Sequence, residues 1–232
     1  MKTNPCLINI AGIKSFNNVL AEIKLLDASL QSENMSQFKL FNDAYQVITN
    51  HIQQAAKDNY FENPKFIEKF TVTFASYYFK AVNDTLTGSK DLTTSWATLN
   101  KLNLKTSPKF VSLLMGANAH INNDLPQVLV RLMEKEDTDN LLSDIVKIDK
   151  LLMLSGKKIV GLFDEPNIKF DFLKRNFKFI YYRPTMYMIL YWRAVAWRNY
   201  RKIKKNNATL SRVNKRSNKI ANRFLRIANI LA

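Results

Sequence analysis

The residues best suited to chemistry are His120 and Asp124, which stand four positions apart in an otherwise apolar helical pattern. That spacing places an imidazole and a carboxylate on one face of a helix. The same face carries Leu113 and Val128, so we expect the pair to point into a core. A buried polar pair destabilises the fold unless it finds partners, and a side chain, a metal or a ligand must therefore satisfy it.

Two kinds of function would use this pair. In one, His120 is a general base that Asp124 orients, and Asn118 holds substrate or backbone. In the other, His120 and Asp124 bind one divalent metal ion from a single helix, as happens in helical bundles. We expect Asp144 to supply the ligand from a second helix, with Asp149 and His51 as alternatives.

A purely structural role remains as an alternative. His120, Asp124, Asn118 and Asn122 would then form a buried hydrogen-bond network that satisfies the distorted backbone near Pro126. The chain lacks the motifs that identify particular enzyme classes: it has no Gly-rich phosphate loop, no Gly-x-Ser-x-Gly and no His-Glu-x-x-His. One cysteine and two histidines are also too few for a Cys/His zinc site.

The elements that position these residues are predicted to be helices. Only 5 glycines and 6 prolines in 232 residues favour long helices with short connections. We expect an all-α, bundle-like single domain of seven or eight helices, with a flexible segment at 1–14, a helical domain at 15–205 and a basic C-terminal helix at 206–232. The other helices are expected at about 15–30, 35–60, 64–88, 93–102, 139–154, 184–205 and 208–231.

The helix that carries His120 is predicted to run from Pro108 to about Glu134. Pro126 lies inside it, lacks a backbone donor and clashes with the carbonyl of Asn122, which predicts a kink there. Further termini are predicted from single residues. Asn63 is the expected N-cap and Gly88 the expected end of the helix at 64–88. Gly156 is the expected C-cap of the helix at 139–154, and Pro184 is expected to open the helix at 184–205.

Positive charge is concentrated in the last quarter of the chain. Residues 172–232 hold 16 Lys and Arg and no Asp or Glu, whereas 1–171 hold 19 basic and 19 acidic residues. Such a segment has three interpretations: contact with nucleic acid, contact with an anionic membrane surface, or a solvated helix packed on the bundle through its apolar side. In the first, Phe177, Phe179, Tyr181 and Tyr182 would stack on bases.

The location of the protein is predicted from what the sequence lacks. No run of ~18 apolar residues is present, and the N-terminal residues do not resemble a secretory signal. The single cysteine, Cys6, gives no sign of an oxidising compartment. We therefore expect a cytoplasmic protein, whose oligomeric state these observations do not address.

Three stretches resemble an uncharacterised, all-helical family of unknown function. Asn118–Pro126 is similar to its Asn-Ala-His-Ile-Asn-x-Asp-Leu motif, Phe61–Phe79 to its Asp-Pro…Phe-Ala-x-x-Tyr helix, and Trp192–Trp197 to its Arg…Ala-Trp helix. Asp144 matches a further family position, whereas Asp149 stands where the family has Asn. The resemblance covers roughly 45–200 and leaves out the basic tail beyond Tyr200. It implies a single helical domain with a shared polar site at Asn118, His120 and Asp124, and no known reaction.

Two hypotheses follow from these observations. The first is an enzyme, in one version dependent on a divalent metal, that acts on a small or lipid-like molecule through His120, Asp124, Asn118 and Asp144. The second is a non-catalytic binding protein in which the His–Asp pair is structural and 172–232 contact nucleic acid or an anionic membrane.

Overall fold

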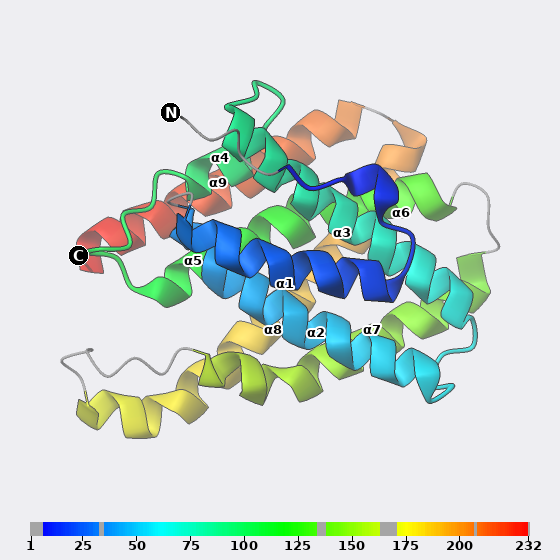
Figure 1. Ribbon diagram of the computed structural model, residues 1–232, viewed down its shortest axis with the longest axis horizontal. Coiled ribbons are helices and arrows are strands. Elements are labelled where there is room, and N and C mark those ends of the chain that lie inside the picture. The colour runs from blue at the N-terminus through cyan, green and yellow to red at the C-terminus, as the bar shows by residue number, and fades with distance from the viewer. Residues whose placement is uncertain (1–6, 33–34, 134–137, 163–170, 207, 232) are drawn as a thin grey trace.

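The computed structural model describes residues 7–32, 35–133, 138–162, 171–206 and 208–231. Across these ranges the chain is all-α and has no strand, and its helices pack around a shared apolar core (Figure 1). The predicted fold class is therefore confirmed. None of the described helices is both long enough and apolar enough to cross a membrane.

The helices differ greatly in length. Their bounds are α1 Phe16–Ser32, α2 Lys39–Lys57, α3 Pro64–Thr87, α4 Thr94–Leu99, α5 Lys109–Asn118, η3 Ala119–Asp124, α6 Leu125–Met133, α7 Thr138–Gly161, α8 Asp171–Lys205 and α9 Ala208–Leu231. Short 3-10 turns at Ile10–Gly12 and Ser36–Phe38 precede α1 and α2. With α5, η3 and α6 counted as one continuous helix, the described residues contain eight helices, within the predicted range.

The helix that carries His120 is distorted just before Pro126. The segment η3 is a π-helix, and the backbone N–H of Leu125 donates to the carbonyl of His120, five residues earlier. A π-turn widens the helix at the point where Pro126 lacks a donor and crowds the preceding turn. The predicted distortion at this proline is thus a π-turn in 119–124, and all six of its residues are buried.

Single-residue signals placed some helix ends correctly. The side chain of Asn63 accepts a hydrogen bond from the backbone N–H of Phe66, so Asn63 caps α3 as predicted. At the other end of α3, Gly88 adopts a left-handed conformation with φ 64°, which costs a glycine little.

Two predicted helix ends were wrong. Gly156 does not end α7, which continues to Gly161, because one glycine inside a helix costs less than breaking the packing around it. Pro184 does not begin a helix but lies inside α8, which starts at Asp171. The structure does not describe the side chains of Phe177, Phe179, Tyr181 and Tyr182. Their stacking on nucleic-acid bases therefore stays a prediction.

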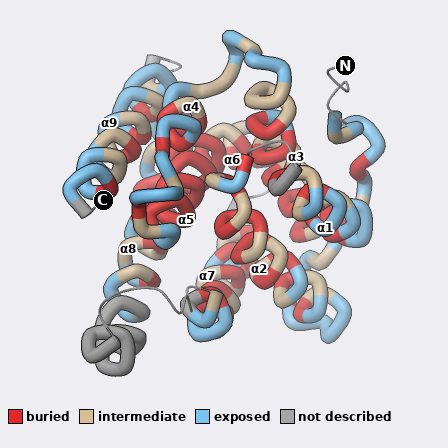
Figure 2. Tube along the Cα trace, turned by 60° about the vertical axis from the view of Figure 1, so that its left-hand side comes forward, coloured by how far each residue is buried: buried red, intermediate tan, exposed pale blue. Residues whose placement is uncertain are grey.

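The π-turn lies at the centre of the bundle. Besides α5 and α6, the helices α3, α4, α8 and α9 all contact η3. In the tube coloured by burial, α5 and α6 are largely buried, whereas α9 turns one side to solvent (Figure 2). The fold therefore places the most polar stretch of the motif helix where it is best shielded from water.

Candidate functional site

His120 and Asp124 form a buried hydrogen-bonded pair. The Nδ1 atom of His120 lies 3.2 Å from Oδ2 of Asp124, and each residue is only 2 % exposed. The prediction that the pair faces inward is therefore correct. The four-residue spacing brings the side chains together even though the backbone between them is a π-turn.

Asp124 accepts hydrogen bonds through both of its carboxylate oxygens. The indole N–H of Trp96, on α4, donates to Oδ2 over 3.0 Å, and the amide of Asn123 donates to Oδ1 over 2.8 Å. Trp96 is 1 % exposed, so it is both a core anchor, as expected, and a polar partner that sequence spacing did not reveal. These donors hold the carboxylate in one orientation.

The environment of His120 favours its neutral form. Burial lowers the pKa of His120, and this effect outweighs the hydrogen bond and charge of Asp124, which raise it. A neutral imidazole carries one N–H, and the carboxylate of Asp124 can only accept it at Nδ1. The Nε2 atom therefore carries a lone pair, and it is buried with no hydrogen-bond partner among the described residues.

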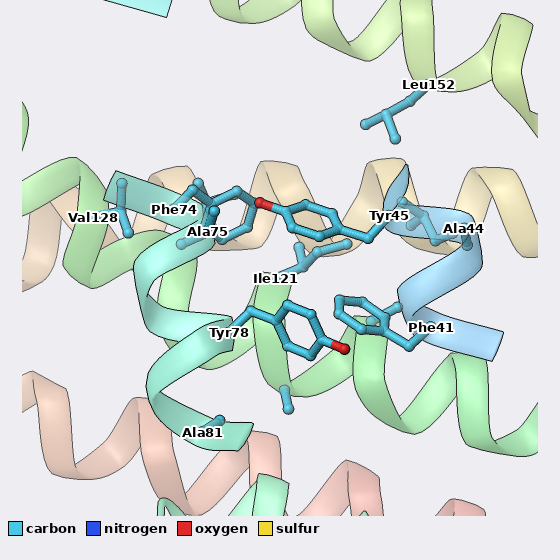
Figure 3. Packing of buried hydrophobic residues seen from close by; sticks show 14 of the residues in the cluster. Phe41, Ala44, Tyr45, Phe74, Ala75, Tyr78, Ala81, Ile121, Val128 and Leu152 are labelled. Carbon is cyan, nitrogen blue, oxygen red and sulfur yellow. The ribbon is translucent and has the colours of Figure 1, made fainter. Parts of the chain in front are cut away.

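Aromatic rings from α2 and α3 enclose the imidazole. Phe74 stacks on it with a centroid distance of 3.6 Å and an angle of 7° between the planes. Phe41 and Tyr45 present their edges, at centroid distances of 5.6 and 5.1 Å. Figure 3 shows these side chains and Tyr78 gathered around Ile121. The rings exclude water from His120 and fix the plane of its imidazole.

A cavity of about 80 Å³ adjoins His120 between α2, α3, α5, η3, α7 and α8. Most of its lining is aliphatic or aromatic, including Ile48, Phe70, Ile148 and Ile189. All three stretches that carry the family resemblance reach this cavity, through Phe70 and Phe74, through His120 and Ile121, and through Arg193.

Four polar atoms on residues that line the cavity are buried without a hydrogen-bond partner among the described residues. They are the Tyr45 hydroxyl, the Thr49 hydroxyl, Nε2 of His120 and Nη2 of Arg193. Each such atom costs about 1–3 kcal/mol. Burial and the nearby Asp124 both raise the pKa of Tyr45, so its hydroxyl keeps its proton and can donate. Native structures hold few such groups, and a cluster of them around one cavity is typical of a ligand site.

Asn118 has a different role from the one expected for a substrate-binding residue. Its amide nitrogen donates to the backbone carbonyl of Ser217 on α9 over 2.9 Å, and its side-chain oxygen accepts from Asn122 over 3.0 Å. Asn118 is fully buried. Of the two roles predicted for it, the structure therefore shows the contact to backbone. The polar side chains expected around Pro126 thus form two separate hydrogen-bonded groups, His120 with Asp124 and Asn118 with Asn122, and the second group also anchors α9.

Asp144 does not join His120 and Asp124. Its two carboxylate oxygens accept the backbone N–H groups of Glu62 and Asn63, over 2.8 and 2.7 Å, at the start of α3. Within the described part of the chain, no three His, Cys, Asp or Glu side chains are grouped as metal ligands. The predicted three-ligand set is therefore not assembled, because Asp144 caps a neighbouring loop.

The two alternative metal ligands are also engaged elsewhere. His51 contacts the Ser155 hydroxyl through Nδ1 over 2.6 Å, and Asp149 accepts a hydrogen bond from Nε of Arg193. Both oxygens of Asp124 already accept N–H donors. This donor set does not fit a metal centre shared by His120 and Asp124, because Nδ1 of His120 is bonded to Asp124 itself and no third imidazole, thiol or carboxylate joins them in the described residues.

Sequence reasoning missed several residues of the site. Phe41 and Tyr45, and likewise Phe70 and Phe74, are aromatic pairs spaced i, i+4, which only indicated a core face. The i, i+4 spacing of Tyr45 and Thr49 puts two hydroxyls on one face of α2, and this signal could have been found in the sequence. Arg193 lies in the stretch that resembles the family's Arg…Ala-Trp helix, but its sequence neighbours are apolar and its partner Asp149 is on another helix, so the sequence did not place it at the site.

Comparison with curated proteins and with solved structures finds no match to this chain. A family model does match, and it includes the basic C-terminal segment that the motif resemblance had left out. The match thus covers nearly the whole chain. By this match over residues 16–232, the protein belongs to DUF5995, a family of unknown function.

Proposed function

We propose that this protein is an enzyme in which His120 accepts a proton from a small, largely apolar molecule held in the cavity. One observation carries the proposal. The imidazole lines the cavity, its Nδ1 is bonded to Asp124, and its Nε2 is buried without a partner in the described structure. A neutral imidazole oriented by a carboxylate is the usual arrangement of a general base.

The proton transfer needs no further reactant. A C–H or O–H bond of the bound molecule breaks, its proton moves to Nε2, and the electron pair stays on the molecule. The imidazolium that forms is stabilised by Asp124. Return of the proton from Nε2 to the same molecule completes the cycle and leaves His120 neutral.

The dimensions of the cavity favour a small substrate over a lipid-like one. Its volume of about 80 Å³ is roughly half that of an engineered apolar cavity that accepts benzene. A long acyl chain does not fit that space. The metal-dependent version of the proposal has less support, because the side chains around Asp124 present N–H donors.

Proton exchange tests the proposal directly. The protein is incubated in D₂O with a panel of small, largely apolar carbonyl compounds, and deuterium incorporation is followed by NMR. We expect incorporation by the wild type and its loss in His120→Gln. The matched control is His51→Gln, which removes the other histidine, on the Ser155 contact, and should keep the exchange. Failure of the wild type, or equal exchange by His120→Gln, contradicts the proposal.

A second candidate function, binding of nucleic acid, is favoured by the outer face of α9. Six cations recur there at helical spacing: Arg212, Lys215, Arg216, Lys219, Arg223 and Arg226. All six are exposed, and none forms an ion pair with a described carboxylate. Val213 and Ala221 are buried on the opposite side, so the apolar side of α9 packs on the bundle. The exposed large apolar side chains of α9, Leu210, Ile227 and Ile230, lie at its two ends, and the cationic stretch between them suits a phosphate backbone.

The charge of this stripe can be varied separately from the cavity. We expect a short RNA or DNA duplex to bind the wild type with an affinity that falls steeply with salt. The triple variant Arg212→Gln, Arg216→Gln, Arg223→Gln should bind more weakly and with a shallower salt dependence. The control Lys14→Gln, Lys24→Gln, Lys101→Gln removes the same net charge from exposed positions elsewhere. Equal binding by both variants, or binding only to anionic vesicles, contradicts this candidate.

A further inference from the structure

Arg193 is an unusual residue in the wall of the cavity. It is 3 % exposed and lies on α8, among apolar neighbours such as Ile189 and Met186. Its Nε donates to Asp149 on α7, which is partly open to solvent. Its Nη2 is buried and has no hydrogen-bond partner among the described residues. A buried guanidinium with an unused donor is costly, and cations are seldom buried unless fully paired.

We propose that Arg193 is the anion-binding residue of the cavity and that the molecule bound there is a small apolar carboxylate. This inference rests on the proposed function, since it assigns the substrate class of the same site. The carboxylate would accept the free Nη2–H donor of Arg193, and the aliphatic walls would enclose the apolar body. A planar guanidinium is well matched to a carboxylate.

Other features of the wall agree with a single negative charge. The hydroxyls of Thr49 and Tyr45 lack partners in the described structure and can donate to the second carboxylate oxygen. Asp149 already neutralises part of the charge on Arg193, and no other Lys or Arg lines this cavity in the described residues. A monoanion therefore suits the site better than a phosphate dianion, which would need further cations.

The family resemblance adds a useful variant. Asp149 stands where the family pattern has Asn. The exchange Asp149→Asn keeps a side-chain oxygen to accept from Nε of Arg193 but removes the competing negative charge. It should leave the guanidinium in place and make the cavity more attractive to an anion.

Calorimetric titration with acetate at constant ionic strength tests the inference, because acetate is small enough for a cavity of about 80 Å³. The uncharged control ligand is acetamide, which has nearly the same shape. We expect acetate to bind the wild type, to bind Arg193→Met about tenfold more weakly or worse, and to bind Asp149→Asn more tightly. The two substitutions should change acetamide binding much less, because acetamide carries no charge.

Each result has a definite meaning. Lack of acetate binding to the wild type, unaltered binding to Arg193→Met, or unaltered binding to Asp149→Asn overturns the inference. If Arg193→Met fails to fold, as shown by circular dichroism, the Asp149→Asn comparison decides alone. Acetate binding by a wild-type protein that shows no proton exchange would contradict the proposed reaction and leave the carboxylate site standing.

Discussion

The imidazole of His120 lies parallel to the ring of Phe74, with centroids 3.6 Å apart and planes inclined by 7°. The stacked ring covers one face of the imidazole, and Asp124 holds its edge through Nδ1. The two contacts together leave the imidazole a single orientation. A reactive atom held in this way needs little reorganisation during proton transfer.

Phe74→Ala and Phe70→Ala should destabilise the fold to a similar extent, but only Phe74→Ala should change the pKa of His120. Deleting either Phe74 or Phe70 removes a buried ring from the same cavity wall and should cost about 3–5 kcal/mol of unfolding free energy. Only Phe74→Ala opens the face of the imidazole, so only there should the pKa of His120 rise toward its ordinary value. An NMR titration of the imidazole measures this, and an equal rise in Phe70→Ala would contradict the prediction.

Asp124 is expected to select the tautomer of His120. Because its carboxylate can only accept, the neutral imidazole should carry its proton on Nδ1, which ¹⁵N–¹H spectra of the histidine ring detect directly. In Asp124→Asn the charge that raises the pKa of His120 is lost, so that pKa should fall further. Asp144→Asn changes a carboxylate that bonds Glu62 and Asn63, and should leave the His120 spectrum unaltered. A proton on Nε2 in the wild type would refute this assignment.

His120 should make the fold less stable in mild acid. Burial lowers its pKa below the ordinary 6.5, so the unfolded chain binds this proton more readily than the folded protein. The contribution of the neutral ring is complete above pH ~6.5 and is lost as the pH falls below that value, by up to about 1.4 kcal/mol per pH unit for one proton. Urea unfolding over this range should show a weaker pH dependence for His120→Gln. If the unfolding free energies of the wild type and His120→Gln depend on pH in the same way, His120 does not make this contribution to stability.

Gly116 is expected to be irreplaceable for steric reasons. A Cβ atom at this position would lie 2.8 Å from Cγ of Phe41, a ring that packs against His120. Gly116→Ala should therefore destabilise the protein by about 1–3 kcal/mol and displace the ring. At Gly161, near the end of α7, an added Cβ meets nothing within 4 Å, so Gly161→Ala should be neutral or slightly stabilising. Thermal unfolding of the two variants would show the contrast, and equal effects would speak against it.

Local signals succeeded where a single residue decides a local conformation. Asn63 and Gly88 end α3 as their chemistry requires, since an N-cap oxygen and a left-handed glycine act within one turn. Gly156 and Pro184 misled because packing along α7 and α8 outweighs the cost of one unfavourable residue. The same limit explains Asp144, whose place on the next helix suggested a ligand but whose partners are the backbone N–H groups of Glu62 and Asn63.

The sequence by itself determined the helical class, the motif helix and the pairing of His120 with Asp124, because all three depend on contacts within a few residues. Only the tertiary structure decided what surrounds that pair. Trp96, Phe74 and Arg193 reach the site from three different helices. Their meeting depends on how the helices pack together, and no periodicity within one segment encodes the distance between segments.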